Sequence, residues 1–246
     1  MKTEGFFVAR SGALLTAGAV ETGKLIIFDC DSTLSAIEGI DELARLKGAG
    51  ERIAALTNAA MNGGRRLEQV YGERLRLIQP SRADLAAIVE QYQQAVVPGA
   101  REVIAALHAA GKRVFIVSGG LSDAVVPFGV WLGVPAERIR AVGLRFDADG
   151  GYAGYDEASP LTTQTGKTAV ITALRAPGRR ALLVGDGSSD AAAAGAVDLF
   201  VGYGGVVFRP NVEENAPVYL YANDLWPVVQ LATGDLLADQ LPNTLA

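Results

Sequence analysis

Four short apolar runs predict the strands of a buried sheet. They are Lys24–Phe28 (KLIIF), Arg113–Val117 (RVFIV), Ala181–Val184 (ALLV) and Asp198–Val201 (DLFV). Each run is followed by polar or glycine residues, and stretches with helical periodicity separate the runs. This alternation is typical of an α/β fold with a doubly wound parallel sheet. Ligands of such sheets bind at the carboxyl ends of the strands, so we expect functional residues directly after the first three runs.

Local signals place two helices and a hairpin between these strands. Ser81 and Asp84 have the spacing of a capping box, and they predict a helix over 82–95. A second helix over 100–110 should end at Gly111, because glycine is the favoured residue just after a helix. Apolar stretches on both sides of an Asp-Gly-Gly turn predict a hairpin within 139–156.

The segment between the first two strands is too long for a simple crossover. We therefore predict that residues 36–96 form a helical cap. The cap would be inserted into a catalytic core made of residues 1–35 and 97–246. The first 23 residues match no pattern of this fold, although FFVAR within them could add a strand.

Composition limits the class of protein and its partners. The chain has 246 residues, half of them apolar, which is enough for one large core with an inserted subdomain. The net charge is only −5 and the basic residues are scattered, so we expect neither a nucleic acid nor a membrane as partner. A single cysteine, Cys30, excludes an internal disulfide and favours the cytoplasm. Composition leaves the oligomeric state open.

Polar residues that could take part in catalysis or ligand binding follow each of the first three strands. Asp29 and Asp31 follow the first strand, and two carboxylates at a strand end suit a hard cation such as Mg²⁺. The same pair could instead cap a turn. VSGG places Ser118 beside two glycines, whose backbone N–H groups can bind phosphate oxygens or merely form a turn.

The later part of the chain supplies further candidates. GDGSSD places Asp186 and Asp190 after the third strand, where another carboxylate could complete a metal site. Lys167 begins a helix in TGKTAV and could neutralise a phosphoryl group, although most lone lysines are solvated.

The order DCDST, SGG, GK and GDGSSD resembles the haloacid dehalogenase superfamily over residues 24–225. More narrowly, EGIDELA, ERLRLIQPSR, GYAGYDE and GYGG resemble the phosphoserine phosphatase family. The resemblance implies a Mg²⁺-dependent hydrolase of L-phosphoserine that works through an aspartyl-phosphate. The substrate would be a small phosphomonoester.

The resemblance also implies a role for each candidate residue. Asp29 would be the nucleophile, and Asp31 the general acid and base. The Asp29 carboxylate, the Asp31 backbone carbonyl and the Asp186 carboxylate would hold Mg²⁺, with Asp190 positioning the lysine or a metal-bound water. The residues implied to bind the phosphoryl group are Ser118, Gly119, Lys167 and Ser189.

Substrate choice would rest on the cap. Glu38 would bind the ammonium group and Arg74 the carboxylate of phosphoserine, with Met61 packing nearby. Three other hypotheses about the function stay open at this point. The chain could be a phosphatase for another small metabolite, a phosphotransferase to an alcohol such as homoserine, or an inactive binding scaffold.

Overall fold

A computed structural model describes residues 7–9, 23–61, 67–176 and 179–233. Its centre is a seven-stranded sheet in the order β1-β9-β8-β7-β2-β3-β4. The strands are β1 (Phe7–Ala9), β2 (Gly23–Phe28), β3 (Arg113–Leu121), β4 (Ile139–Val142), β7 (Arg180–Gly185), β8 (Leu199–Tyr203) and β9 (Val218–Leu220). All neighbouring pairs are parallel except β1 and β9. The four predicted strands are confirmed, and β1 lies within the FFVAR segment.

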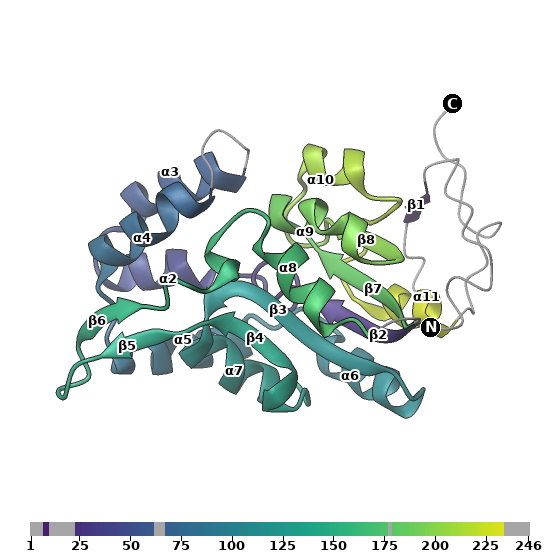
Figure 1. Cartoon of the computed structure of the whole chain (residues 1–246), viewed down its shortest axis with the longest axis horizontal. Coiled ribbons are helices and arrows are strands. Elements are labelled where there is room, and N and C mark those ends of the chain that lie inside the picture. Colours follow the sequence, from purple (N-terminus) through teal and green to yellow (C-terminus); the bar gives the residue numbers. More distant parts are fainter. Residues whose placement is uncertain (1–6, 10–22, 62–66, 177–178, 234–246) are drawn as a thin grey trace.

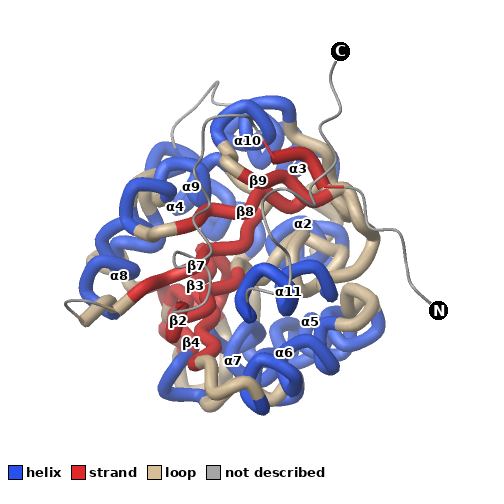
Figure 2. The backbone as a smooth tube through the Cα atoms, turned by 90° about the vertical axis from the view of Figure 1, so that its right-hand side faces the viewer, coloured by secondary structure: helices blue, strands red, loops and turns tan. Residues whose placement is uncertain are grey.

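Helices cover both faces of this sheet, which confirms the doubly wound fold (Figure 2). One face carries α6 (Ala100–Ala109), α7 (Ser122–Trp131) and α11 (Trp226–Thr233). The other face carries α8 (Gly166–Leu174) and α9 (Ser188–Ala192). The short α10 (Pro210–Asn215) joins β8 to β9. Three 3-10 turns lie at Ala136–Arg138, Pro160–Thr162 and Ala194–Ala196. Residues 25–28 of β2 are buried between β3 and β7.

In the described part of the chain, four helices lie between β2 and β3. They are α2 (Gly39–Leu46), α3 (Gly50–Met61), α4 (Leu67–Ile78) and α5 (Arg82–Gln94). The first three gather at one end of the molecule, beside a hairpin (Figure 1). In contrast, α5 packs against α7 of the sheet layer as well as against α2. The division into a core and a cap at 36–96 stays a prediction.

The predicted helix signals are present. Ser81 accepts a hydrogen bond from the Asp84 backbone N–H, and the Asp84 carboxylate accepts one from the Ser81 N–H, so the capping box is complete. Gly111 follows α6 in the left-handed conformation, with φ 72°. Side chains avoid this conformation, which explains why glycine ends the helix there.

Two elements differ from their predictions. The second strand does not stop at Val117, because β3 continues to Leu121 and pairs with β4 again at its last residue after an irregularity. The hairpin within 139–156 is shorter than predicted and consists of β5 (Leu144–Phe146) and β6 (Tyr152–Tyr155). Residues Ile139–Val142 join the main sheet as β4 instead, since the side chains of Ile139 and Val142 continue its buried surface.

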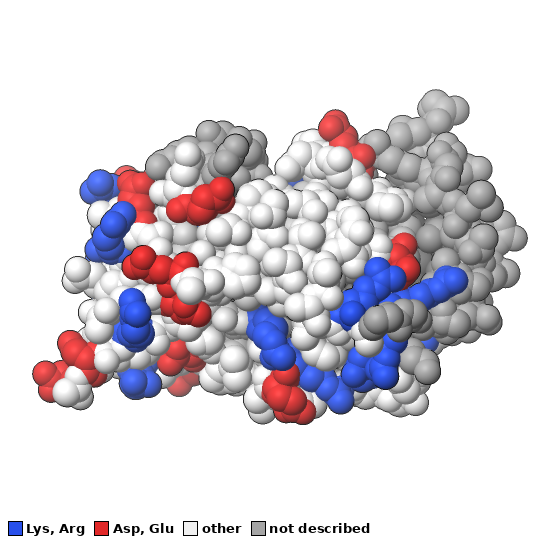
Figure 3. Space-filling view, in the orientation of Figure 1, with Lys and Arg blue, Asp and Glu red and all other residues white. Residues whose placement is uncertain are grey.

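Surface charges of both signs are mixed on much of the face in Figure 3. One group of basic side chains lies at the lower right of this view, and others lie at its left edge. Arg113, Arg138 and Arg179, at the amino ends of β3, β4 and β7, are close enough to interact. Among the described residues, no helix is long and apolar enough to cross a membrane.

Candidate active site

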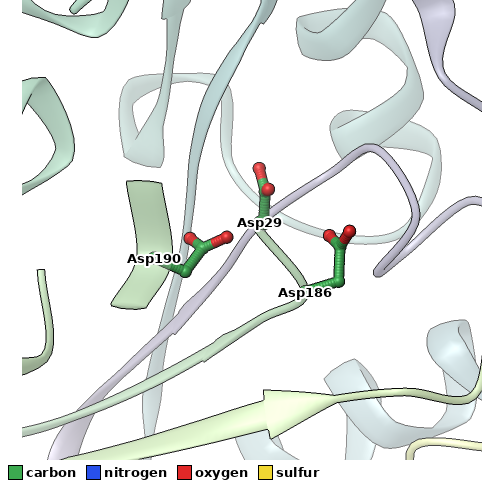
Figure 4. A group of neighbouring side chains, drawn as sticks. All are labelled: Asp29, Asp186 and Asp190. Carbon is green, nitrogen blue, oxygen red and sulfur yellow. The ribbon is translucent and has the colours of Figure 1, made fainter. Parts of the chain in front are cut away.

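Three aspartates bring their carboxylates together at the carboxyl edge of the sheet (Figure 4). Asp29 directly follows β2, Asp186 follows β7, and Asp190 lies in α9. One carboxylate oxygen from each lies within 4.8 Å of the others, and all three residues are buried. Such a compact group of oxygens is the donor set that hard divalent cations prefer. The cluster therefore fits a cation of the Mg²⁺ type.

Lys167 is the cation that balances this cluster in the structure. Its Nζ lies 2.7 Å from Asp29 Oδ2 and 2.7 Å from Asp190 Oδ1, and its side chain is only 4% exposed. Burial alone would lower the pKa of Lys167, but the two carboxylates outweigh burial and raise the pKa above its ordinary value. Lys167 therefore stays protonated and places a positive charge beside Asp29.

Arg209 brings a second buried cation to the site. Its Nε donates to Asp186 Oδ2 at 3.1 Å, and its Nη2 lies 3.7 Å from Glu38 Oε1. The other oxygen of Asp186 accepts a hydrogen bond from Thr33 Oγ1 at 3.0 Å. Burial raises the pKa of Asp186 to about 6, the charge of Asp29 adds to this shift, and Arg209 opposes it. Arg209 thus links the aspartate cluster to Glu38.

The Asp31 carboxylate is held by residues of α2 and α5, which belong to the helices between β2 and β3, called the inserted helices below. Its Oδ1 accepts hydrogen bonds from the Gly39 N–H at 2.7 Å and from the Tyr92 hydroxyl at 2.6 Å. Burial raises the pKa of Asp31 to about 6, while both hydrogen bonds lower it and the charge of Asp29 raises it. A carboxyl group with such a pKa can both donate and accept a proton near neutral pH.

The glycine-containing end of β3 lines a pocket together with Asp29, Asp31, Lys167 and Asp186. The Ser118 side chain is buried, and its Oγ accepts a hydrogen bond from the Gly120 N–H at 2.9 Å. The Gly119 carbonyl accepts one from the Tyr71 hydroxyl at 2.8 Å. Ser189, in the first turn of α9, lines this pocket together with Asp29 and Lys167. The structure thus brings together the residues predicted to bind phosphate, and their role stays a prediction.

The two residues predicted to choose the substrate also line this pocket. Glu38 precedes α2 and accepts a hydrogen bond from Ser32 Oγ at 2.7 Å. Arg74, in α4, is 5% exposed, and its guanidinium carbon lies 5.5 Å from the centre of the Tyr71 ring. Burial raises the pKa of Glu38 and lowers that of Arg74. Met61 ends α3, and its side chain lies outside the described residues.

Several site residues were not predicted from the sequence as functional, among them Tyr92, Tyr71 and Arg209. Tyr92 lies within the helix predicted over 82–95, but no sequence signal indicates its hydrogen bond to Asp31. Tyr71 is likewise a buried tyrosine, in α4. Arg209 is a lone basic residue after the apolar run VVF, which is the one signal that could have singled it out.

Sequence comparisons now identify the family. A haloacid dehalogenase-like hydrolase profile matches residues 24–198. The human phosphoserine phosphatase is 36% identical over 197 residues, which cover 79% of this chain and 88% of that protein. The chloroplastic phosphoserine phosphatase of Arabidopsis thaliana is also 36% identical, covering 78% of this chain and 67% of that one. The chain belongs to the phosphoserine phosphatase family of haloacid dehalogenase-like hydrolases.

Solved structures of this family have the same fold. A phospho-aspartyl intermediate analogue of phosphoserine phosphatase has a TM-score of 0.75 at 28% identity, covering 85% of this chain and 98% of that one. A substrate-bound phosphoserine phosphatase complex has the same TM-score and identity, with coverage of 85% and 97%. The phosphoserine phosphatase family and the haloacid dehalogenase-like fold, both predicted from the sequence, are therefore confirmed.

Proposed function

We propose that the protein hydrolyses O-phospho-L-serine with Mg²⁺ through an aspartyl-phosphate on Asp29. The observation that carries this proposal is the distribution of charge within one pocket. Lys167 and Ser118 lie beside Asp29 at one end, where a phosphate can bind. Glu38 and Arg74 line the same pocket on the side of the inserted helices. These groups complement a phosphate, an ammonium and a carboxylate, which are the three charged groups of phosphoserine.

The first step transfers the phosphoryl group to the enzyme. A carboxylate oxygen of Asp29 attacks phosphorus while the bond from phosphorus to the serine oxygen breaks. Asp31 gives its proton to the departing serine oxygen. Lys167, which Asp190 holds in place, stabilises the phosphoryl oxygens together with Ser118, Gly119 and Ser189.

The second step returns Asp29 to its starting state. The Asp31 carboxylate takes a proton from a water molecule, whose oxygen attacks phosphorus while the bond from phosphorus to Asp29 breaks. Inorganic phosphate is released. Mg²⁺, held by the carboxylates of Asp29 and Asp186 and by the Asp31 carbonyl, would supply positive charge that reduces the repulsion between nucleophile and phosphate. Asp190 contacts Lys167 and would contribute to Mg²⁺ binding only indirectly.

The substrate is tested with a panel of phosphomonoesters that includes O-phospho-L-serine and O-phospho-D-serine. We expect Mg²⁺-dependent phosphate release with the highest kcat/KM for the L-serine ester. Addition of homoserine, followed by product analysis, distinguishes hydrolysis from transfer to an alcohol. Absence of Mg²⁺-dependent release from every ester would instead indicate a binding scaffold. We propose the cytoplasm as the site of this activity, since Cys30 is a buried free thiol.

Arg74→Ala should separate recognition of serine from the chemistry. We expect kcat/KM for O-phospho-L-serine to fall roughly 10²-fold or more, because a buried contact between charged groups is lost. A small phosphate ester without a carboxylate, such as ethanolamine phosphate, should change by less than about threefold. Arg76→Ala is the matched control, since Arg76 lies in the same helix with an exposed side chain. Equal losses for both esters would make Arg74 structural and favour another small-molecule substrate.

The pKa values of Asp31 and Asp186 predict how Mg²⁺ stabilises the fold. Both are about 6 in the metal-free protein, above the value of about 3.9 for an unfolded aspartate. Between these values the folded state retains protons that the unfolded state has lost. The contribution of these groups to stability is therefore complete below about pH 4 and is lost as pH rises through about 6. Above that pH the buried carboxylates repel one another, and a bound cation relieves the repulsion.

Saturating MgCl₂ should therefore raise the melting temperature by several degrees at about pH 7.5 and by much less at about pH 5. Differential scanning fluorimetry measures this difference, with KCl of equal ionic strength as the control for screening. Asp186→Asn should reduce the shift at the higher pH, because it removes one ligand charge. The same shift at both pH values would contradict a cation site beside the Asp31 and Asp186 carboxylates.

A further inference from the structure

The two oxygens of the Asp31 carboxylate face different parts of the protein. Oδ1 is bound by two donors, the Tyr92 hydroxyl from α5 and the Gly39 N–H from α2. Oδ2 lies beside the glycine-containing end of β3, where a Cβ at Gly120 would be 2.9 Å from it and 3.1 Å from Ser118 Oγ. Oδ2 is therefore directed at the part of the pocket where phosphate is expected.

The Tyr92 hydroxyl is held firmly in place. The residue is 1% exposed, and its ring stacks on Phe128 of α7 with the ring centres 5.2 Å apart. A Cβ on Gly39 would lie 2.1 Å from the Tyr92 oxygen, so the hydroxyl occupies space that only a glycine leaves open. Because the ring is anchored on Phe128 of the sheet layer, it can fix Asp31 relative to the phosphate pocket.

We propose that Tyr92 is a positioning residue that fixes the Asp31 carboxylate so that Oδ2 alone exchanges protons with the substrate. A carboxylate oxygen has about two lone-pair sites, and the two donors occupy those of Oδ1. The proton that Asp31 gives to the serine oxygen must therefore sit on Oδ2. In the second step the same oxygen receives the proton of the attacking water. This assignment rests on the proposed function of Asp31 as acid and base.

Tyr92→Phe tests the assignment, because it keeps the ring on Phe128 and removes only the hydroxyl. We expect kcat/KM for O-phospho-L-serine to fall roughly 10- to 100-fold, since its alkoxide leaving group depends on a well-placed proton. The value for p-nitrophenyl phosphate should change by less than about threefold, because nitrophenolate leaves without protonation. A residue that only stabilises the fold would slow both esters equally, and that result would overturn the proposal.

A second measurement needs no organic ester. Incubation with Mg²⁺ and inorganic phosphate in ¹⁸O-labelled water allows reversible formation of the aspartyl-phosphate, which moves labelled oxygen into phosphate. This exchange uses Asp31 to move the proton of water, so Tyr92→Phe should slow it by roughly tenfold. Exchange at the wild-type rate would contradict the proposal even if p-nitrophenyl phosphate were not a substrate.

Gly39→Ala should break the hydrogen bond from Tyr92 to Asp31 without removing the hydroxyl. The added Cβ would displace the Tyr92 hydroxyl while the tyrosine remains. It should reproduce the losses of Tyr92→Phe, and the double variant should be no slower than about the worse single variant. Additive losses would mean that the two residues act separately, and they would overturn the proposal. This variant also keeps the test decisive if Tyr92→Phe fails to fold.

Tyr203→Phe is the matched control. Tyr203 is fully buried outside the pocket, and within the described residues its hydroxyl has no hydrogen-bond partner. It should leave both esters and the oxygen exchange unchanged. Failure of the proposed function is recognised separately, because the wild-type protein would then release no phosphate from O-phospho-L-serine. If Asp31→Asn also failed to discriminate between the two esters, the acid role of Asp31 would be wrong and the role of Tyr92 with it.

Discussion

Asp29→Asn should lower kcat for O-phospho-L-serine by roughly 10⁴-fold or more. The amide keeps the size of the side chain, but it cannot attack phosphorus and it removes one charge from the buried three-aspartate cluster. An acid quench during turnover of ³²P-labelled substrate should trap a labelled protein for the wild type and none for the variant. Steady-state phosphate release and this trapping measure the two consequences independently.

Asp149→Asn is the control for this experiment, since Asp149 is an exposed aspartate in the hairpin turn. It should retain wild-type activity and labelling. Folding of both variants can be checked by near-ultraviolet circular dichroism. A folded Asp29→Asn protein with more than about a tenth of wild-type activity would exclude covalent catalysis at this residue.

Lys167→Met should damage both stability and catalysis. The substitution leaves Asp29 and Asp190 as buried carboxylates without the cation that lies 2.7 Å from each. Removing one partner of a buried ion pair costs about 3–5 kcal/mol in the free energy of unfolding, which urea denaturation can measure. Activity should fall by at least roughly 10³-fold, because the charge beside the phosphoryl oxygens is lost as well.

A compensating substitution separates these two effects. In the double variant Lys167→Met and Asp190→Asn, one buried charge is neutralised, so much of the lost stability should return. Activity should remain low, since no cation is restored beside Asp29. Recovery of activity along with stability would show that Lys167 serves only to balance Asp190.

The sequence predicted those parts of the fold that depend on local or periodic signals. The apolar runs at β2 and β7 are recognisable because both strands are buried on both faces of a parallel sheet. The extension of β3 to Leu121 was not predictable, because the two glycines that usually indicate a turn are here part of the strand. Similarly, a turn signal could not show that β4 belongs to the main sheet rather than to the hairpin.

For the candidate site, the sequence predicted the residues at strand ends but not the residues that contact them. The residues that follow strand ends, such as Asp29 and Asp186, were expected near one another because parallel strands end at the same edge. The partners of these residues were not. Tyr92 and Arg209 reach the site from distant parts of the chain, and burial of a tyrosine or an arginine can be explained by packing alone. These contacts depend on the tertiary structure, and the spacing of residues along the sequence does not indicate them.

The position of β2 inside the sheet, between β7 and β3, has a consequence for how the chain folds. Its neighbours β3 and β7 are both far away along the sequence, and the inserted helices form within the loop to β3. Closing such long loops is entropically costly, so these pairings are expected to be late events in folding. The helices can form earlier from local contacts. Catalytic competence therefore arises only with the last long-range contacts, and a partly folded chain rich in helix would be unable to turn over substrate.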